Sequence, residues 1–301
     1  PFFASDAVKN KYSFIEVYAS DEARIAAGLK KEEKPPVYSA LYRYNGKTIL
    51  LVRSFSYSPS DYSVEVYLKY FKAVMKEYEP LADVLVMDQT HNPGGNGWYC
   101  SNLASMLLKE KNDAPVQMCR ADRKWLDSML NVTDNENKFP NGLRLNVAMG
   151  LVIEKAYDEG KLLSEPVAIF TDSLKLAPFG DYKWKKPRLV LIDELAGSCG
   201  DVFPMILRDN NAAKFFGKRT MGLGGNVEQV GVLNNSQVKI SMTRGLFMTN
   251  KEDGKYQDAD YIENNGVQPD YPYSHTVQDF RNGFTNYVEE FSKKAIEQIE
   301  K

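Results

Sequence analysis

Histidine and cysteine are scarce in this sequence, which has two histidines and three cysteines among 301 residues. The cysteines are Cys100, Cys119 and Cys199, an odd number without close spacing. A disulfide framework and a zinc site both require closer or more regular spacing, so the sequence argues against each of them. One pair remains able to form, which leaves the redox compartment undecided.

Long apolar runs and an excess of one charge are also absent. No run reaches the roughly 20 apolar residues that span a bilayer, so we expect no membrane partner. The 38 Lys and Arg residues nearly balance the 40 Asp and Glu residues, which gives a net charge of −2. The sequence therefore lacks the excess of positive charge that is typical of nucleic-acid-binding proteins. Tyrosine is plentiful, with 18 residues, which suits an extended peptide groove and equally a plain core.

The chain starts at Pro1, with neither an initiator methionine nor a targeting segment. We therefore expect a piece of a longer protein, cut by processing or by experimental design. Residues 1–36 end in a charged run followed by two prolines, and they are predicted to be a linker or the tail of an upstream domain. Residues 37–301 are predicted to form one core domain.

Strand and helix patterns alternate through the middle of the chain, which predicts an α/β core. An Asn45-Gly46 turn joins two apolar-alternating runs into a hairpin. The polar segment from Arg120 to Asn141 has no clear pattern. The predicted strands are 38–44, 48–53, 84–87, 116–119 and 189–192, followed by a β-rich run over 215–248. The predicted helices are 64–78, 98–108, 145–156 and 201–207. A terminal amphipathic helix is predicted from residue 277, with Phe280, Phe284, Val288 and Phe291 on one side.

Ser198 follows the predicted strand 189–192 at a sharp turn, within Gly197-Ser-Cys-Gly-Asp201. That order presents a hydroxyl at a helix N-terminus, where free backbone N–H groups and the helix dipole favour a developing anion. Several acyl-transfer enzymes present a nucleophile in this way. On this pentapeptide alone, a simple N-cap serine explains the pattern at least as well.

A second strand-to-helix turn, Asn92-Pro-Gly-Gly95, follows the predicted strand 84–87. Its two glycines allow the backbone to approach a ligand closely. Combined with Ser198, the turn predicts an oxyanion hole formed by the N–H groups of Gly94 or Gly95 together with that of Cys199. Glu263, beside a glycine turn, is a candidate for the carboxylate that a catalytic triad needs, although a surface glutamate in such a place is ordinarily without a role.

The order of four motifs resembles the tail-specific (C-terminal processing) serine peptidases, closest to the branch of the chlamydial protease-like activity factor. The resemblance runs from about Val37 to the C-terminus. It rests on Asn92-Pro-Gly-Gly95, on Ser198-Cys-Gly-Asp201 and the residues through Asn210, on Gly217-Lys-Arg-Thr-Met-Gly222, and on Tyr261-Ile-Glu-Asn264 with the following Gly-Val-Gln-Pro-Asp270.

The resemblance implies a serine endopeptidase on an α/β core similar to the crotonase and Clp-protease superfamily, a mixed sheet with flanking helices. Ser198 would be the nucleophile and Glu263 the carboxylate that orients a histidine. Neither a metal nor an organic cofactor is implied. The substrates would be proteins or peptides, the protein would be exported to the periplasm or secreted, and a homodimer is left open.

The general base is where the sequence departs from the family pattern. Typical members use a lysine where this chain has Leu223, and Lys218 lies on the wrong side of that motif. The chlamydial branch uses a histidine of its N-terminal half, so we expect the base to come from an N-terminal fragment of the same precursor after internal cleavage. His91 is an alternative base or a substrate contact, and His275 is expected to be a surface or turn residue.

A rival interpretation is a catalytically inactive peptide-binding or scaffolding module derived from a peptidase. The missing lysine and the lack of an obvious histidine in the chain favour it. Acyl-CoA chemistry on a crotonase-like core is a third interpretation. It would require a CoA-binding pocket, which no feature of the sequence indicates.

Overall fold

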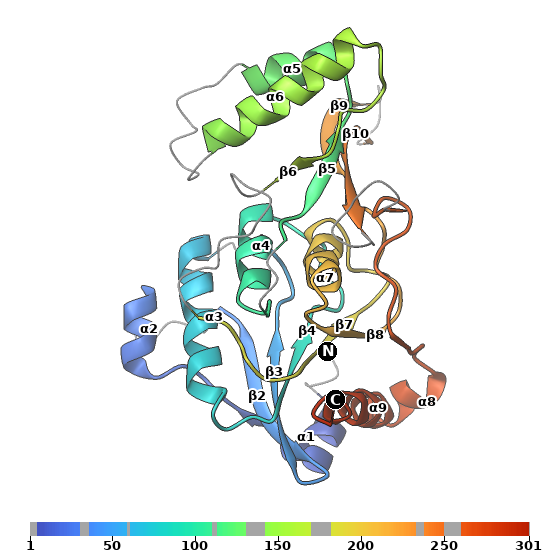
Figure 1. Ribbon diagram of the computed structural model, residues 1–301. Helices are drawn as coiled ribbons and strands as arrows, with labels where there is room; N and C mark the ends of the chain where they lie inside the picture. The colour runs from blue at the N-terminus through green and yellow to red at the C-terminus, as the bar shows by residue number, and fades with distance from the viewer. Residues whose placement is uncertain are drawn as a thin grey trace.

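The structure is a computed structural model, which describes residues 5–30, 36–58, 61–109, 113–130, 142–169, 182–232, 238–249 and 260–300. Its helices and strands form an α/β core around a seven-stranded sheet, with a smaller sheet and two helices at one end (Figure 1). The mixed sheet with flanking helices agrees with the fold class that the sequence predicts.

The large sheet is antiparallel at one edge and parallel through its centre. A tight turn at Asn45 and Gly46, both with positive φ, closes the β2–β3 hairpin in the predicted register. From β3 onward every neighbouring pair is parallel. The strand order is β1 (Ile15–Glu16), β2 (Tyr38–Tyr44), β3 (Lys47–Arg53), β4 (Val84–Asp88), β7 (Arg188–Ile192), β8 (Lys214–Gly217) and β12 (Tyr271–Pro272).

Both faces of β4 and β7, in the centre of the parallel region, are buried, so their residues are mostly apolar in unbroken runs. Leu85 and Met87 of β4 pack into one hydrophobic cluster, whereas Val84 and Val86 pack into another on the opposite face. The first cluster includes residues of α2 (Asp21–Ala27), α3 (Val64–Tyr78), α4 (Gly97–Ser105) and α7 (Cys199–Asp209), and the second includes residues of α1 (Asp6–Tyr12) and α9 (Thr285–Ile296).

The smaller sheet lies beyond the ends of α4 and α7 (Figure 1). Its order is β11 (Asp260–Tyr261), β10 (Lys239–Thr249), β5 (Val116–Cys119) and β6 (Val167–Ala168), with β9 (Asn226–Val232) also paired to β10. Two helices, α5 (Arg123–Leu130) and α6 (Gly142–Asp158), pack on each other beside this sheet. The α5 helix lies in the polar segment that has no clear sequence pattern, and residues 131–141 of that segment lie outside the described ones.

The predicted terminal helix is two helices, which corrects the sequence-based expectation. The α8 helix (Val277–Arg281) ends before Gly283, and Phe284 takes a left-handed backbone conformation with φ 68° before α9 starts. The break changes the direction of the chain, so the expected apolar side does not continue. Phe280 is 64% exposed, while Tyr287, Val288 and Phe291 are buried.

The segment predicted as a linker or tail contains residues that pack on the core. Val8 and Tyr12 of α1 are buried in the cluster that includes α9, and Val17 and Leu29 are buried in the other cluster. The β1 strand extends the large sheet by pairing with β2. Assignment of this segment to an upstream domain stays a prediction.

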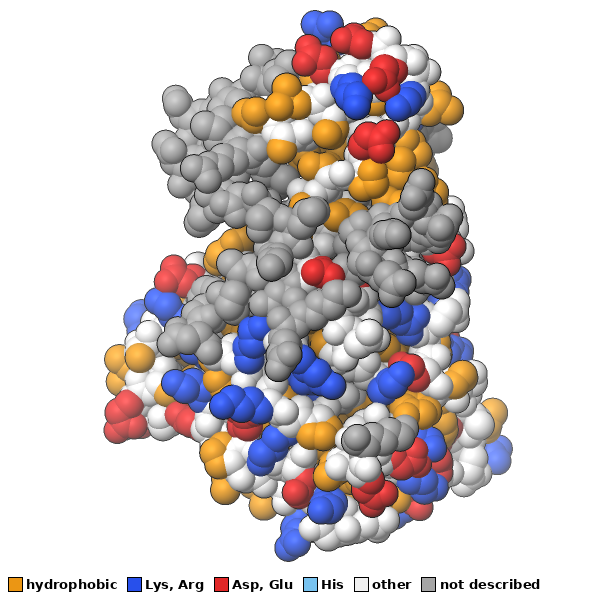
Figure 2. Space-filling model, viewed as in Figure 1, with side chains coloured by type: hydrophobic (Ala, Val, Ile, Leu, Met, Phe, Trp, Pro, Cys, Tyr) orange, Lys and Arg blue, Asp and Glu red, His pale blue; other side chains and the backbone are white. Residues whose placement is uncertain are grey.

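The face of the molecule drawn in Figure 2 carries side chains of both charges. On the face seen in Figure 2, Lys and Arg side chains alternate with Asp and Glu, and hydrophobic side chains gather toward the end where β9, β10 and α6 lie. In the described part of the chain, no helix combines the length and apolar composition that crossing a bilayer requires.

Candidate active site

Ser198 lies at the N-cap position of α7, in the turn that follows β7, as the sequence predicts. Its backbone has φ 55° and ψ −120°, a region that residues with a side chain rarely adopt. The Ser198 hydroxyl makes no capping hydrogen bond with the helix. An N-cap serine would normally adopt an extended backbone and bond to the N2 or N3 amide. The strained turn and the missing capping bond therefore argue against a purely capping serine.

The Asn92–Gly95 loop lies against the serine turn. A Cβ atom on Gly94 would stand 2.5 Å from Ser198 Cβ and 2.8 Å from the Cys199 nitrogen, and Gly94 has φ +96°. The Gly197 N–H donates to the Asn92 carbonyl at 3.0 Å, which joins the two loops. Only glycine allows this approach, so the two turns form one structural unit.

The oxyanion donors that the sequence predicts are not equivalent. The Gly94 N–H already donates to Asn92 Oδ1 at 2.9 Å. In the described part of the chain, no protein acceptor takes the N–H of Gly95 or that of Cys199. These two groups therefore remain available for an anion, while Gly94 provides the close backbone approach.

All three cysteines are free and buried. The Cys199 thiol donates to the Gly95 carbonyl oxygen at 3.1 Å, which ties the two predicted donors together. Burial raises the pKa of the neighbouring Cys100 thiol well above its usual value, and contact with Cys199 adds to that shift. Burial and the raised pKa therefore both favour the protonated form of the Cys100 thiol.

A third loop, residues 222–225, supports the serine from the other side. The Ser198 N–H donates to the Leu223 carbonyl oxygen at 3.0 Å. Asp201, fully buried, accepts from the Gly222 and Leu223 N–H groups at 2.9 and 3.0 Å. Burial raises the pKa of the Asp201 carboxyl group, and these hydrogen bonds act in the opposite direction.

Glu263 follows β11 and is half-buried. Its Oε2 atom accepts the Gly225 N–H at 2.8 Å, and the next residue, Asn264, donates from its backbone to the Gly222 carbonyl at 2.7 Å. The loop that touches Ser198 is thus the same loop that holds Glu263. The structure brings the predicted nucleophile and carboxylate to one cluster of loops, with residues 222–225 between them.

His91 is paired with Asp193, a contact that sequence reasoning missed. Its Nδ1 atom lies 2.5 Å from Asp193 Oδ2, and its backbone N–H donates to Asp193 Oδ1 at 2.8 Å. The ring is 61% exposed and does not line the pocket beside Ser198. The parallel pairing of β4 and β7 was the available signal, because the carboxyl ends of adjacent parallel strands meet at one edge.

His275 is an exposed residue, as expected, but its ring packs among aromatic side chains. The ring centroid lies 4.5 Å from that of Tyr287 and 5.5 Å from that of Phe284. Burial lowers the pKa of His275. Nothing among its described contacts connects it to Ser198.

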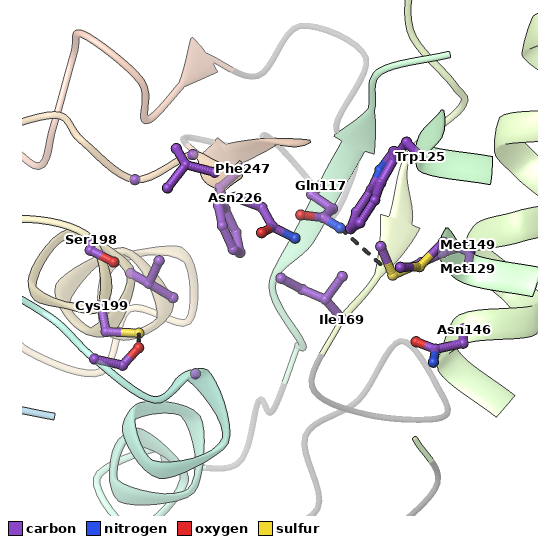
Figure 3. A pocket seen from close by; sticks show the side chains of 16 residues that line it. Gln117, Trp125, Met129, Asn146, Met149, Ile169, Ser198, Cys199, Asn226 and Phe247 are labelled. Atoms are coloured by element: carbon purple, nitrogen blue, oxygen red, sulfur yellow. Dashed lines mark hydrogen bonds between the residues drawn. The ribbon is translucent and has the colours of Figure 1, made fainter. Parts of the chain in front are cut away.

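A pocket of about 390 Å³ opens beside Ser198 between the core and the smaller sheet (Figure 3). Sequence reasoning missed most of its wall, because the wall is assembled from separate stretches of the chain. The lining consists of residues 95, 97, 117, 125, 129, 146, 149, 169, 198, 199, 202, 224–227 and 247. Within the described ranges, no group of three or more His, Cys, Asp or Glu side chains is arranged to hold a metal ion.

Comparison with known proteins identifies the family. The model of peptidase family S41 matches residues 67–273, which include both glycine-rich turns, Ser198 and Glu263. The chain belongs to peptidase family S41. A Chlamydia pneumoniae protein is 32% identical over 243 residues, and a Chlamydia trachomatis protein is 30% identical over 251 residues.

A solved structure of this S41 fold supports the same relationship. Mature CPAF, complexed with lactacystin, is 25% identical with a TM-score of 0.71, and the match covers 95% of this chain and 57% of that one. The predicted resemblance to the chlamydial protease-like activity factor and the predicted fold are thereby confirmed. A Parabacteroides merdae protein of solved structure, with a TM-score of 0.57 at 17% identity, shares the fold; that match covers 92% of this chain and 70% of that one.

The chain spans only part of the relatives it matches. The match covers 73% of this chain but 38% of the Chlamydia pneumoniae protein, and 76% against 41% for the Chlamydia trachomatis protein. The activity, substrates and partners of the whole protein are therefore proposed rather than assigned.

Proposed function

We propose that this S41 chain is the serine-bearing portion of a tail-specific serine endopeptidase with a Ser-His-Glu triad. The observation that carries the proposal is the strained turn at Ser198. The turn leaves the hydroxyl without a capping hydrogen bond, next to the Cys199 N–H, and the N–H groups of Cys199 and Gly95 have no acceptor in the described part of the chain. A serine placed in this way is arranged for attack on a carbonyl carbon rather than for helix capping.

In the proposed reaction, Ser198 Oγ attacks the scissile carbonyl while a histidine accepts the hydroxyl proton. The carbonyl oxygen becomes an oxyanion, which the Gly95 and Cys199 N–H groups stabilise. The histidine then donates the proton to the leaving amine, and the C–N bond breaks to give an acyl-enzyme. Water, deprotonated by the same histidine, hydrolyses the ester. Glu263 orients the histidine and stabilises its charged form.

We assign the histidine to an N-terminal portion of the same precursor, with activation by internal cleavage. Two observations support this assignment. His91 uses Nδ1 to bind Asp193 and stays outside the pocket lining, and His275 packs among aromatic rings. The curated relatives are more than twice as long as the matched region. Export of the protein and a homodimer remain further parts of the proposal.

A catalytically inactive peptide-binding module is the second candidate. The observation in its favour is Leu223, whose backbone supports Ser198 at the position where typical members carry the basic lysine. Such a module would keep the pocket but would not form an acyl-enzyme.

The deciding experiment is intact-mass analysis after treatment with a fluorophosphonate probe, with and without the N-terminal portion of the precursor. We expect one adduct, on Ser198, when both portions are present. Ser198→Ala should remove the adduct and lower peptide hydrolysis on the order of 10⁴-fold or more. The matched variant Ser274→Ala changes an exposed serine and should leave labelling intact. A complete precursor without an adduct would favour the binding module.

A further inference from the structure

The pocket beside Ser198 contains a buried polar atom that lacks a partner in the described part of the chain, Gln117 Oε1. Gln117 is 1% exposed and comes from β5. Its Nε2 group faces two sulfur acceptors, Cys119 Sγ at 3.5 Å and Met149 Sδ at 3.8 Å. Although sulfur accepts hydrogen bonds weakly, these contacts orient the amide with its oxygen on the other side.

The position of this oxygen is built into the smaller sheet. Gly245, on the neighbouring strand β10, pairs with Cys119 in register. A Cβ atom on Gly245 would lie 2.5 Å from Gln117 Oε1, so a larger residue would displace the amide. A buried carbonyl oxygen without a donor costs free energy, and native proteins rarely keep one unless a ligand or a water satisfies it.

Charged side chains are absent from the lining of the pocket where the structure describes it. Its described lining contains no Lys, Arg, Asp, Glu or His side chain. Trp125, Met129, Ile169 and Phe247 contribute apolar surface to the pocket, and Asn226 from β9 adds a second amide. A charged substrate group would lose its hydration here without a counter-ion, which is strongly unfavourable.

Ser198 and Gln117 line the same pocket from different elements. Figure 3 shows Ser198 and Cys199 at one side and Gln117, Ile169 and Trp125 toward the other, with Phe247 and Asn226 between them. A substrate carbonyl held at Ser198 would therefore direct the side chain of its own residue toward Gln117.

We propose that this pocket binds the residue on the acyl side of the scissile bond and selects a glutamine there. The substrate carboxamide donates an N–H to Gln117 Oε1, and its methylene groups contact the apolar wall. This inference rests on the proposed function, because Ser198 defines which substrate residue lies at the pocket.

Binding to the Ser198→Ala chain, assembled with its N-terminal portion, tests the selection without requiring hydrolysis. Three peptides that differ only in having Gln, Met or Glu at the acyl-side position have side chains of nearly equal length. We expect the Gln peptide to bind about tenfold more tightly than the Met peptide by titration calorimetry, and the Glu peptide to bind most weakly. Equal or tighter binding of the Met peptide, or no binding of any of the three at millimolar concentration, would overturn the proposal.

The Gln117→Met substitution in the same chain removes the acceptor at nearly constant volume. It should reverse the order, so that the Met peptide binds more tightly than the Gln peptide. The matched control is Gln278→Met on the exposed side of α8, which should leave the order unchanged. If Gln117→Met keeps the preference for glutamine, Gln117 is not the selecting residue.

Hydrolysis by the unmodified Ser198 chain, assembled with its N-terminal portion, separates the two proposals. If the Gln peptide binds most tightly but no peptide is cleaved, the glutamine selection by the pocket is supported and the catalytic role of Ser198 is refuted. Cleavage that depends on Ser198 but favours the Met peptide would sustain the catalytic role and refute the glutamine selection.

Discussion

The backbone N–H of Ser198 donates to the carbonyl oxygen of Leu223 at 3.0 Å. Leu223 occupies the position at which the typical family pattern has its basic lysine, and here the residue is 54% exposed. The residue therefore contributes to the site through its backbone, by holding the turn that presents the nucleophile. Its own N–H is held in turn by Asp201 Oδ2.

Replacing Asp201 by Asn tests this support. One carboxylate oxygen becomes an NH₂ group that faces a backbone N–H, so one buried donor loses its acceptor. We expect the free energy of unfolding to fall by about 1–3 kcal/mol in urea denaturation, and labelling of Ser198 to slow. The exposed control Asp158→Asn should change stability by less than about 0.5 kcal/mol. Equal stability of the two variants would contradict this role.

Gly94→Ala should disable the site by direct contact with the serine turn. The added methyl group would stand 2.5 Å from Ser198 Cβ, at a backbone φ that alanine rarely adopts. Gly160 offers a matched control, because it also has positive φ but no atom lies within 4 Å of where its methyl group would stand. Both variants should lose about 1–3 kcal/mol of unfolding free energy through backbone strain, and only Gly94→Ala should abolish fluorophosphonate labelling. Labelling that survives in Gly94→Ala would argue against close packing of the two turns.

Glu263→Gln should reduce catalysis while preserving the fold. Glutamine retains an oxygen that can accept the Gly225 N–H, but it lacks the charge that stabilises an imidazolium. We expect kcat/KM for peptide hydrolysis by the assembled protein to fall on the order of 10³- to 10⁴-fold, with an unchanged melting temperature. Glu290→Gln, on α9, removes only a surface pair with Lys293 and should leave kcat/KM as it was. A marked fall in melting temperature alongside the loss of activity would indicate a structural role instead.

His275 should make the protein less stable below neutral pH. Burial lowers the pKa of its imidazole below the ordinary 6.5, although Asp279, Glu194 and Asp193 act in the opposite direction, with Lys218 reinforcing the shift. The unfolded chain then binds more protons than the folded one between the lowered pKa and 6.5. The stability that neutral His275 contributes is complete above pH 6.5. It declines as the pH falls from 6.5 through the lowered pKa of the folded state.

The comparison with His275→Phe isolates this contribution. Phenylalanine fits an aromatic cluster and does not titrate, so the difference in unfolding free energy between the two chains should change between about pH 7.5 and about pH 5. The original chain should lose more stability than the variant on acidification. Parallel urea-denaturation profiles across that range would show that His275 does not titrate differently in the folded state.

Local patterns were sufficient for much of the fold. The hairpin at Asn45-Gly46, the helix 64–78, and the apolar strands at 84–88 and 188–192 were predicted closely, because each is encoded by a turn signal, a helical period or a buried run. The terminal helix was the exception. Its apolar spacing continues through Phe284, but Gly283 ends α8 in a left-handed conformation, with the Phe284 N–H donating to the Asp279 carbonyl oxygen. This glycine C-cap is a local stop signal, and the apolar period extends across it.

The candidate site divides in the same way. The amino-acid sequence by itself determined the two glycine-containing turns, the position of Ser198 at a helix N-terminus and the membership of the family, since short-range backbone geometry depends on glycine and serine at fixed spacing. The bond from the Gly94 N–H to Asn92 Oδ1 spans two residues and belongs to the same local turn. Only the tertiary structure decided that His91 pairs with Asp193 and that Gln117 lines the pocket beside Ser198. These residues are distant in the chain, so sheet pairing and helix packing, rather than neighbouring residues, bring them together.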